Sequence, residues 1–253
     1  MVEVKLDQHF LEDKELLDKI VNLSDIKESD IVFEIGPGKG DLTKAILKKN
    51  PSKLIAIEKD VALKDYLSLE LVENSNLEII YGDGILELDN HLITKLIANI
   101  PYSITEPLYT KILDLKLPFC VLLHGIDFYK NIIERDTKWK YFVPAFYDLE
   151  LLEEVEGSKF NPKTKVKSVF IKLKLKNDND LLNDNNFFQY LWNKRSRNTK
   201  NALIYTFVDT YNLTKTQAEE KVLKLNLDNE VLNKNLENLS NREFIEIIEK
   251  LMI

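Results

Sequence analysis

Residues 31–43 read Ile-Val-Phe-Glu-Ile-Gly-Pro-Gly-Lys-Gly-Asp-Leu-Thr, the pattern of a short buried strand, a glycine-rich turn and the start of a helix. Gly36 and Gly38 let the backbone approach a ligand closely. The spacing is Gly-x-Gly-x-Gly, so the dinucleotide fingerprint Gly-x-Gly-x-x-Gly is not met. Glu34, an acid within the strand, suits a cofactor that lacks a pyrophosphate. A plain tight turn is the alternative interpretation of the glycines.

Short apolar runs alternate with helix-length segments through the first 125 residues. Besides residues 31–35, the predicted strands are residues 54–57, 77–81, 96–98 and 119–123, and the segments with helix length are 41–49 and 61–72. This alternation predicts an α/β fold, a parallel sheet with helices on both faces. Residues 166–175 form a further predicted strand, in which the lysine spacing changes parity and suggests a β-bulge.

The character of the chain changes near residue 177. Residues 177–186 are rich in Asn and Asp, as linkers often are. Helical patterns follow, and Thr214 and Ser240 each begin a capping-box spacing before an apolar periodic stretch. We therefore expect one domain at residues 1–176 and a small all-helical C-terminal domain at residues 177–253.

Length and composition exclude several classes of protein. A chain of 253 residues with 44% apolar residues can bury a real core. No run of 18 apolar residues exists, so we expect no membrane partner. Cys120 is the only cysteine, which excludes an internal disulfide and fits a cytoplasmic location. We also expect a monomer, and no His, Cys and Asp cluster suggests a metal site.

The net charge of −7 is unusual for a nucleic-acid binder, because neutralisation of phosphates dominates that affinity. Two acid-free basic stretches, residues 157–177 and 185–208, weaken this objection. The candidate RNA contacts within them are Lys163, Lys165, Lys167, Lys194, Arg195, Arg197 and Lys200. Two solvated faces are the alternative explanation.

Carboxylates follow the second and third predicted strands. Glu58, 24 residues after Glu34, can accept hydrogen bonds from both hydroxyls of a ribose. Asp83, within Gly82-Asp83-Gly84, can accept a hydrogen bond from an adenine amino group. Each acid alone would be an ordinary loop residue. Because ligands bind at the carboxyl ends of parallel strands, their succession favours one ligand site.

The fourth predicted strand ends in Asn99-Ile100-Pro101-Tyr102, the most specific pattern in the chain. The amino group of adenine is a poor nucleophile because its lone pair is delocalised into the ring. The Asn99 side-chain oxygen and the Ile100 carbonyl can accept its hydrogens and free that lone pair. Pro101 restricts the backbone, and Tyr102 offers a face on which an extruded base can stack. The pattern predicts attack of this nitrogen on the methyl carbon of a sulfonium donor, with positioning as the main source of rate.

Over nearly its whole length the chain resembles the KsgA/Dim family of rRNA adenine N6,N6-dimethyltransferases, with the Erm resistance methylases as close cousins. Residues 8–11, Gln-His-Phe-Leu, resemble the opening motif in a form associated with archaeal members, and residues 34–43 match the first motif. Residues 160–168 resemble the Phe-x-Pro-x-Pro-x-Val-x-Ser stretch, with Thr164 in place of the second proline. Residues 191–203 resemble the family's basic helix.

The resemblance implies a Rossmann-like class I methyltransferase domain that uses S-adenosylmethionine as its cofactor. The cofactor contacts that it implies are His9, Leu11, Gly36, Glu58, Asp83 and Asn99. It also implies that Asn99, Pro101 and Tyr102 handle the target base. The implied substrate is small-subunit rRNA, with two adjacent adenines near its 3′ end each methylated twice during ribosome biogenesis.

Two segments near the expected RNA face depart from the family pattern. Residues 123–128, Leu-His-Gly-Ile-Asp-Phe, stand where Gln-x-Glu is usual, and residues 137–144 replace a Tyr-Gly-Arg-Leu-Ser type stretch. His124 is then either a base-contacting residue or a structural histidine at a strand end, and we favour the structural role.

Two alternative functions remain open from the sequence. An Erm-like methylase of large-subunit rRNA is favoured slightly by Asn-Ile-Pro-Tyr in place of Asn-Leu-Pro-Tyr. A ribosome-assembly or transcription accessory factor that binds cofactor and RNA with little turnover would explain the altered segments and the acidic net charge. The intact pattern at residues 99–102 argues against this second alternative.

Overall fold

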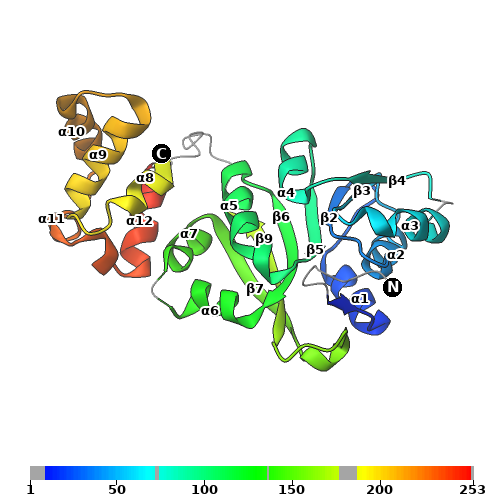
Figure 1. The fold of residues 1–253 in the computed structure, drawn as a ribbon. Coiled ribbons are helices and arrows are strands. Elements are labelled where there is room, and N and C mark those ends of the chain that lie inside the picture. Colours follow the sequence, from blue (N-terminus) through cyan, green and yellow to red (C-terminus); the bar gives the residue numbers. More distant parts are fainter. Residues whose placement is uncertain (1–8, 72–73, 136, 177–186, 252–253) are drawn as a thin grey trace. The chain divides into compact units, whose positions relative to one another are not determined.

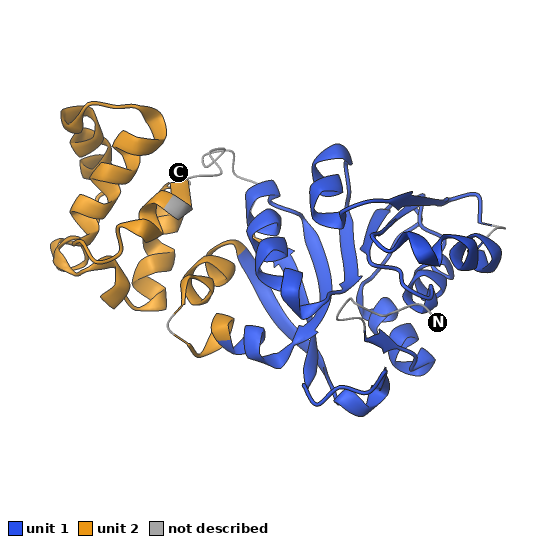
Figure 2. Cartoon of the chain, viewed as in Figure 1, with its two compact units in different colours: residues 1–130, 147–175 blue, residues 131–146, 176–253 orange. Residues whose placement is uncertain are grey.

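A computed structural model describes residues 9–71, 74–135, 137–176 and 187–251. The chain divides into two compact units, shown in Figure 2: residues 1–130 with 147–175, and residues 131–146 with 176–253. Residues 131–146, which the sequence-based division placed in the first domain, therefore group with the C-terminal helices. The linker predicted at residues 177–186 lies outside the described residues.

Unit 1 is built on a seven-stranded sheet with the order β4-β3-β2-β5-β6-β9-β7 (Figure 1). Its strands are β2 (Ile31–Ile35), β3 (Lys53–Glu58), β4 (Leu77–Tyr81), β5 (Lys95–Asn99), β6 (Phe119–Gly125), β7 (Tyr147–Val155) and β9 (Ser168–Leu175). The first five strands in this order are parallel, and β9 pairs antiparallel with both β6 and β7. The expected α/β sheet is confirmed, with two antiparallel strands added at one edge.

The point where strand order reverses lies between β2 and β5. The chain steps outward from β2 through β3 to β4, and then returns to place β5 beside β2 and β6 beyond it. Because parallel crossovers are right-handed, connections that run in opposite directions place their helices on opposite faces of the sheet. The carboxyl ends of β2 and β5 therefore border a crevice, the usual ligand site in such sheets.

The helices of unit 1 follow the pattern expected from the alternation. They are α1 (Lys14–Leu23), α2 (Asp41–Leu47), α3 (Lys64–Leu71), α4 (Gly84–Glu87), α5 (Thr105–Leu115) and the start of α6 (Ile126–Ile133). Single 3₁₀ turns are η1 (Val61–Leu63), η2 (Leu88–Asn90), η3 (Tyr102–Ile104) and η4 (Gly157–Lys159). The central strands are largely apolar, with Glu34 in β2 as a buried exception, since parallel strands are covered on both faces.

A core on one face of the sheet joins α1 and α2 to the strands. Ile20 of α1 and Ile46 of α2 are fully buried with Val32 and Leu54 in one apolar cluster. Cys120 is also fully buried, and this burial raises the pKa of its thiol. A buried, protonated thiol is a packing residue rather than a nucleophile.

The β-bulge suggested for residues 166–175 lies on the neighbouring strand instead. The register between β7 and β9 shifts between Leu151 and Glu153, so the extra residue belongs to β7. Lys167 precedes β9, whose first residue is Ser168, and this explains the change in lysine parity without a bulge in β9.

A second, two-stranded sheet pairs β1 (Phe10–Leu11) with β8 (Phe160–Asn161) in antiparallel register. These short strands lie 150 residues apart in the chain, since Phe10 opposes Asn161 and Leu11 opposes Phe160. The pairing brings the N-terminal segment to the strand-end edge described below.

Unit 2 is helical. Its elements are the end of α6, α7 (Lys138–Phe146), α8 (Phe187–Asn193), α9 (Thr199–Tyr211), α10 (Lys215–Lys224), α11 (Asn229–Asn233), η6 (Leu236–Asn238) and α12 (Asn241–Leu251). Rings of Phe142 on α7 contact Trp192 on α8 and Phe244 on α12, which explains why α7 belongs here. Both predicted capping boxes form, at Thr214 and at Ser240. No described helix is long and apolar enough to cross a membrane.

Candidate functional site

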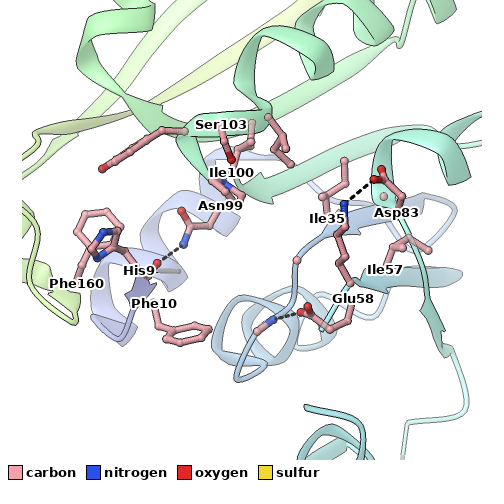
Figure 3. A pocket seen from close by; sticks show the side chains of 17 residues that line it. His9, Phe10, Ile35, Ile57, Glu58, Asp83, Asn99, Ile100, Ser103 and Phe160 are labelled. Carbon is pink, nitrogen blue, oxygen red and sulfur yellow. Dashed lines mark hydrogen bonds and ion pairs between the residues drawn. The ribbon is translucent and has the colours of Figure 1, made fainter. Parts of the chain in front are cut away.

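The carboxyl ends of β2, β3, β4 and β5 border one cavity (Figure 3). The predicted site residues that line it are His9, Gly36, Gly38, Glu58, Asp83, Asn99, Ile100, Pro101 and Tyr102. Figure 3 shows Asn99 and His9 on one side and Glu58 and Asp83 on the other. Leu11 is the exception among the predicted site residues of this edge, because its side chain is buried in the core and does not line the cavity.

Glu58 holds the loop after β2 in place. Its carboxylate accepts hydrogen bonds from the Gly38 amide at 3.0 Å and from the Asp60 amide at 2.7 Å. The side chain is 3% exposed, and the two amides stabilise its charge. Each carboxylate oxygen has a second lone pair, so the group can still accept from two ligand hydroxyls.

Gly36 and Gly38 are required by their backbone conformations. Both have positive φ, +69° and +56°, which favours glycine. A Cβ at Gly38 would lie 2.6 Å from the Phe10 ring, whereas a Cβ at Gly36 would meet nothing within 4 Å. The space beside Gly36 is therefore open to a ligand, and the loop fits a cofactor with a ribose for Glu58 to bind.

Asp83, on the same side of the cavity as Glu58, caps the short helix α4. Its Oδ1 accepts from the Ile85 amide at 3.0 Å, and its Oδ2 pairs with the Lys59 ammonium at 3.0 Å. The Lys59 ammonium, helped by the Ile85 amide, holds the pKa of this carboxyl below its usual value. Asp83 is therefore an anionic acceptor, as expected for recognition of an amino group.

Glu34 is a fully buried acid behind the cavity loop. Neither of its oxygens, nor the Thr43 hydroxyl, has a hydrogen-bond partner among the described residues. Burial raises the pKa of Glu34 to about 8. The nearby Thr43 hydroxyl lowers this pKa, although it does not form a hydrogen bond with good geometry, and the Glu58 carboxylate raises it further. Glu34 is therefore mostly protonated near neutral pH.

Asn99 is oriented by the N-terminal segment. Its side-chain nitrogen donates to the His9 carbonyl at 3.2 Å, which leaves its side-chain oxygen available as an acceptor. His9 is itself fixed, because its Nδ1 lies 2.9 Å from the Pro162 carbonyl. The chain thus determines which end of the Asn99 amide can accept a hydrogen bond.

Ile100 and Tyr102 complete this side of the cavity. The Ile100 amide donates to the Leu123 carbonyl of β6 at 2.9 Å, which ties the loop after β5 to the sheet. Tyr102 is half-buried, and its hydroxyl shares a hydrogen bond of 3.0 Å with Ser168. Pro101 lies between them with φ −54° and opens the turn that carries Tyr102.

Phe10 and Phe160 were not predicted as site residues, yet both line the cavity. Phe160 packs edge-on against the His9 ring, with centroids 6.5 Å apart. The only sequence signal for either residue was its place in a motif-like stretch, because the β1 and β8 pairing that places them is too short and too distant to predict.

His124 has the structural role favoured from the sequence. It is fully buried, with Nε2 2.9 Å from the Tyr109 hydroxyl and Nδ1 3.0 Å from the Gly125 carbonyl. Burial lowers its pKa to about 4, so the ring is neutral. It does not line the cavity.

The candidate RNA contacts of unit 1 differ in their availability. Lys163 and Lys165 are exposed on the loop between β8 and β9, and neither has an acidic partner among the described residues. Lys167 pairs with Glu156 at 2.7 Å. Lys163 and Lys165 are therefore the more available pair, and they follow the cavity residue Phe160 by only a few residues in sequence.

The candidate RNA contacts of unit 2 are mostly engaged within the protein. Lys194 pairs with Asp209 at 2.6 Å and has a side chain only 14% exposed. Arg195 lies 4.0 Å from Glu237, and Arg197 lies over the Tyr205 ring. Lys200 is exposed, without an acidic partner in the described part of the chain.

Comparison with known proteins gives a consistent result. A family model described as "Ribosomal RNA adenine dimethylase" matches residues 2–250. Two archaeal proteins named "Probable ribosomal RNA small subunit methyltransferase A" are similar to the chain. The protein from Methanococcoides burtonii is 31% identical, and the match covers 95% of this chain and 90% of that protein. The protein from Methanococcus maripaludis is 35% identical, and the match covers 79% of this chain and 80% of that protein.

Two solved structures share the fold over nearly the whole chain. A dimethyladenosine transferase from Plasmodium falciparum superposes with a TM-score of 0.70 at 23% identity, over 94% of this chain and 96% of that chain. The 23S rRNA methyltransferase ErmE superposes with a TM-score of 0.66 at 17% identity, over 96% of this chain and 99% of that chain. At these identities the likenesses show the fold alone.

The buried acid predicts a pH dependence of stability. Because Glu34 binds its proton more tightly in the folded protein than in the unfolded chain, folding free energy is lost as pH rises from about 5 to about 8. We expect Glu34→Gln, which cannot ionise, to gain stability relative to wild type over this range. Urea unfolding of the ligand-free protein at about pH 5 and about pH 8.5 measures this difference. The exposed Glu156→Gln variant is the control, and parallel curves for wild type and Glu34→Gln would contradict the assignment.

Substitutions on the two sides of the cavity should affect cofactor affinity differently. Glu58→Gln weakens acceptance by a charged group, so its affinity for S-adenosylhomocysteine should fall about tenfold or more. Tyr102→Ala should retain that affinity within about twofold, because we expect Tyr102 to face the target base rather than the cofactor. Isothermal titration calorimetry compares them, and an equal loss in both variants would refute the division.

Proposed function

The chain belongs to the ribosomal RNA adenine dimethylase family, and we propose that it methylates the exocyclic amino group of adenine in small-subunit ribosomal RNA. It is an S-adenosylmethionine-dependent rRNA methyltransferase. The observation that carries the proposal is the placement of Asn99 and Ile100 across one cavity from Glu58 and Asp83.

Glu58, Asp83 and the glycine loop are the residues that would hold the cofactor. Glu58 accepts from ribose hydroxyls, and the open space beside Gly36 lets the backbone lie against the ligand. Asp83 would accept a hydrogen bond from the amino group of the cofactor's adenine. When bound, S-adenosylmethionine supplies an electrophilic methyl group on a positively charged sulfur.

Asn99 and Ile100 act on the nucleophile. The Asn99 side-chain oxygen and the Ile100 carbonyl oxygen accept the two amino hydrogens of the target adenine, which draws the nitrogen towards tetrahedral geometry. With these hydrogens held, the nitrogen lone pair would be free to take up the methyl group that the cofactor would supply, and a nitrogen-bound proton would pass to water. Catalysis rests on positioning, because no strong base is required.

Tyr102 presents a ring face to the target base. A base in a duplex is inaccessible, so a single-stranded or extruded adenine has to enter the cavity. Stacking on an aromatic ring is worth about 1–3 kcal/mol and tolerates any base. Selectivity for adenine therefore rests on the two acceptors, Asn99 and Ile100, rather than on Tyr102.

The small ribosomal subunit is the proposed partner, and the proposed acting form is a monomer. The names of the two archaeal relatives support the substrate. Lys163 and Lys165 support contact with the RNA backbone, because both are exposed, have no acidic partner among the described residues and follow the cavity residue Phe160 closely in sequence. Lys167, Lys194 and Arg195 remain weaker candidates because acids of the protein already lie beside them.

Asn99→Ala tests the proposed chemistry. Loss of one of the two acceptors should lower methyl transfer to adenines of unmodified small subunits by about a hundredfold or more. The assay counts labelled methyl groups on adenine after digestion of the rRNA. Asn76→Ala is a matched control. The Asn76 side chain also donates to a backbone carbonyl, that of Pro51, but Asn76 lies at the amino end of β4, away from the strand ends that border the cavity. Label on wild-type product elsewhere than adenine, or full activity of Asn99→Ala, would reject the proposal.

The salt dependence of RNA binding tests the two free lysines. Lys163→Ala with Lys165→Ala should reduce the slope of log affinity against log salt by about 1.5, the value for two lost phosphate contacts. Lys221→Ala with Lys224→Ala removes the same charge from exposed positions on α10. Equal slopes for both double variants would remove the loop between β8 and β9 from the interface.

A further inference from the structure

Tyr102 is held at two places by residues outside its own turn. Its hydroxyl shares a hydrogen bond of 3.0 Å with the Ser168 hydroxyl, and Ser168 is 1% exposed. The carbons Cδ1 and Cε1 of its ring lie against Gly125, where an added Cβ would be 3.2 and 3.3 Å away. The ring is thus tethered at its tip and supported along its edge.

These two supports belong to one structural unit. Gly125 ends β6 and Ser168 begins β9, and the two residues are direct partners in the antiparallel register of these strands (Figure 1). Ser168 also pairs with Val155 of β7, so it is anchored on both sides. The sheet therefore provides a rigid base for a side chain carried by a short 3₁₀ turn.

We propose that Ser168 is a positioning residue for methyl transfer, acting together with Gly125 to set the plane of the Tyr102 ring. The inference rests on the proposed function, in which Tyr102 stacks the target base. Ser168 does not line the cavity, so it acts through Tyr102 rather than on the substrate.

A tether is needed because the tyrosine ring can otherwise turn about its side-chain bonds. The stacked base follows the plane of that ring, and the plane determines whether the amino group meets the Asn99 and Ile100 oxygens. Small errors in the placement of reacting atoms are costly in catalysis. Burial of Ser168 keeps water from replacing the hydrogen bond, so the tether persists while the cavity is open to solvent.

The test is a double-mutant cycle with Ser168→Ala and Tyr102→Phe, which remove the same hydrogen bond from its two ends. Each single variant should lower kcat for unmodified small subunits about tenfold, the factor that one such hydrogen bond can supply. The double variant should be no slower than either single variant. Affinity for S-adenosylhomocysteine should be unchanged in all three, because Glu58 and Asp83 are intact.

Ser24→Ala is the matched control for stability. Ser24 is also fully buried in unit 1, and its hydroxyl donates to the Ile20 carbonyl at 2.9 Å beyond the end of α1. It should lower the unfolding temperature as Ser168→Ala does but leave kcat at the wild-type value. Gly125→Ala adds a methyl group that presses on the Tyr102 ring, and it should lower kcat without removing any hydrogen bond.

Ser168→Ala with wild-type kcat, or losses from Ser168→Ala and Tyr102→Phe that multiply in the double variant, would overturn the inference. Tyr102→Ala separates this failure from failure of the proposed function. If Tyr102→Ala abolishes methyl transfer while Ser168→Ala has no effect, only the tether is wrong. If Tyr102→Ala retains full activity, stacking on Tyr102 is itself wrong.

Discussion

Two backbone amides and one carboxylate hold the ligand edge of this protein together. Glu58, at the end of β3, accepts from the Gly38 amide in the loop after β2 and from the Asp60 amide beyond its own strand. The bonds compensate the burial of its charge, and they keep the glycine loop curved around open space. The side of the cavity proposed for the cofactor depends on this arrangement, because an unheld loop would be free to close over the space beside Gly36.

The side of the cavity proposed for the target base depends on contacts between distant parts of the chain. Asn99 is oriented by the His9 carbonyl, and His9 is located by Pro162. The pairing of β1 with β8 brings these segments together. The proposed cofactor side is thus built mainly from local strand-to-helix turns. The proposed base side instead requires the N-terminal segment and the segment from β8 to β9 to lie together.

The same difference explains how much could be predicted from the sequence. Continuous apolar runs and glycines predicted the parallel strands, and the position of Glu58, Asp83 and Asn99 at successive strand ends predicted one cavity. β7 was not predicted, because its acid-rich residues lack the apolar run of the parallel strands. Phe10, Phe160 and the Ser168 tether could not be predicted, since each depends on pairing between segments far apart. The sequence-based division placed α7 within residues 1–176, whereas the structure groups it with the C-terminal helices, because its ring contacts with α8 and α12 cannot be seen in local sequence patterns.

A crystal structure with S-adenosylhomocysteine bound would test most directly whether four strand ends form one site. We expect the ribose hydroxyls at the Glu58 carboxylate and the adenine amino group at Asp83, with the sulfur facing Asn99 and Tyr102 across the cavity. A cofactor bound in another cavity, or one whose sulfur is directed away from Asn99, would contradict it.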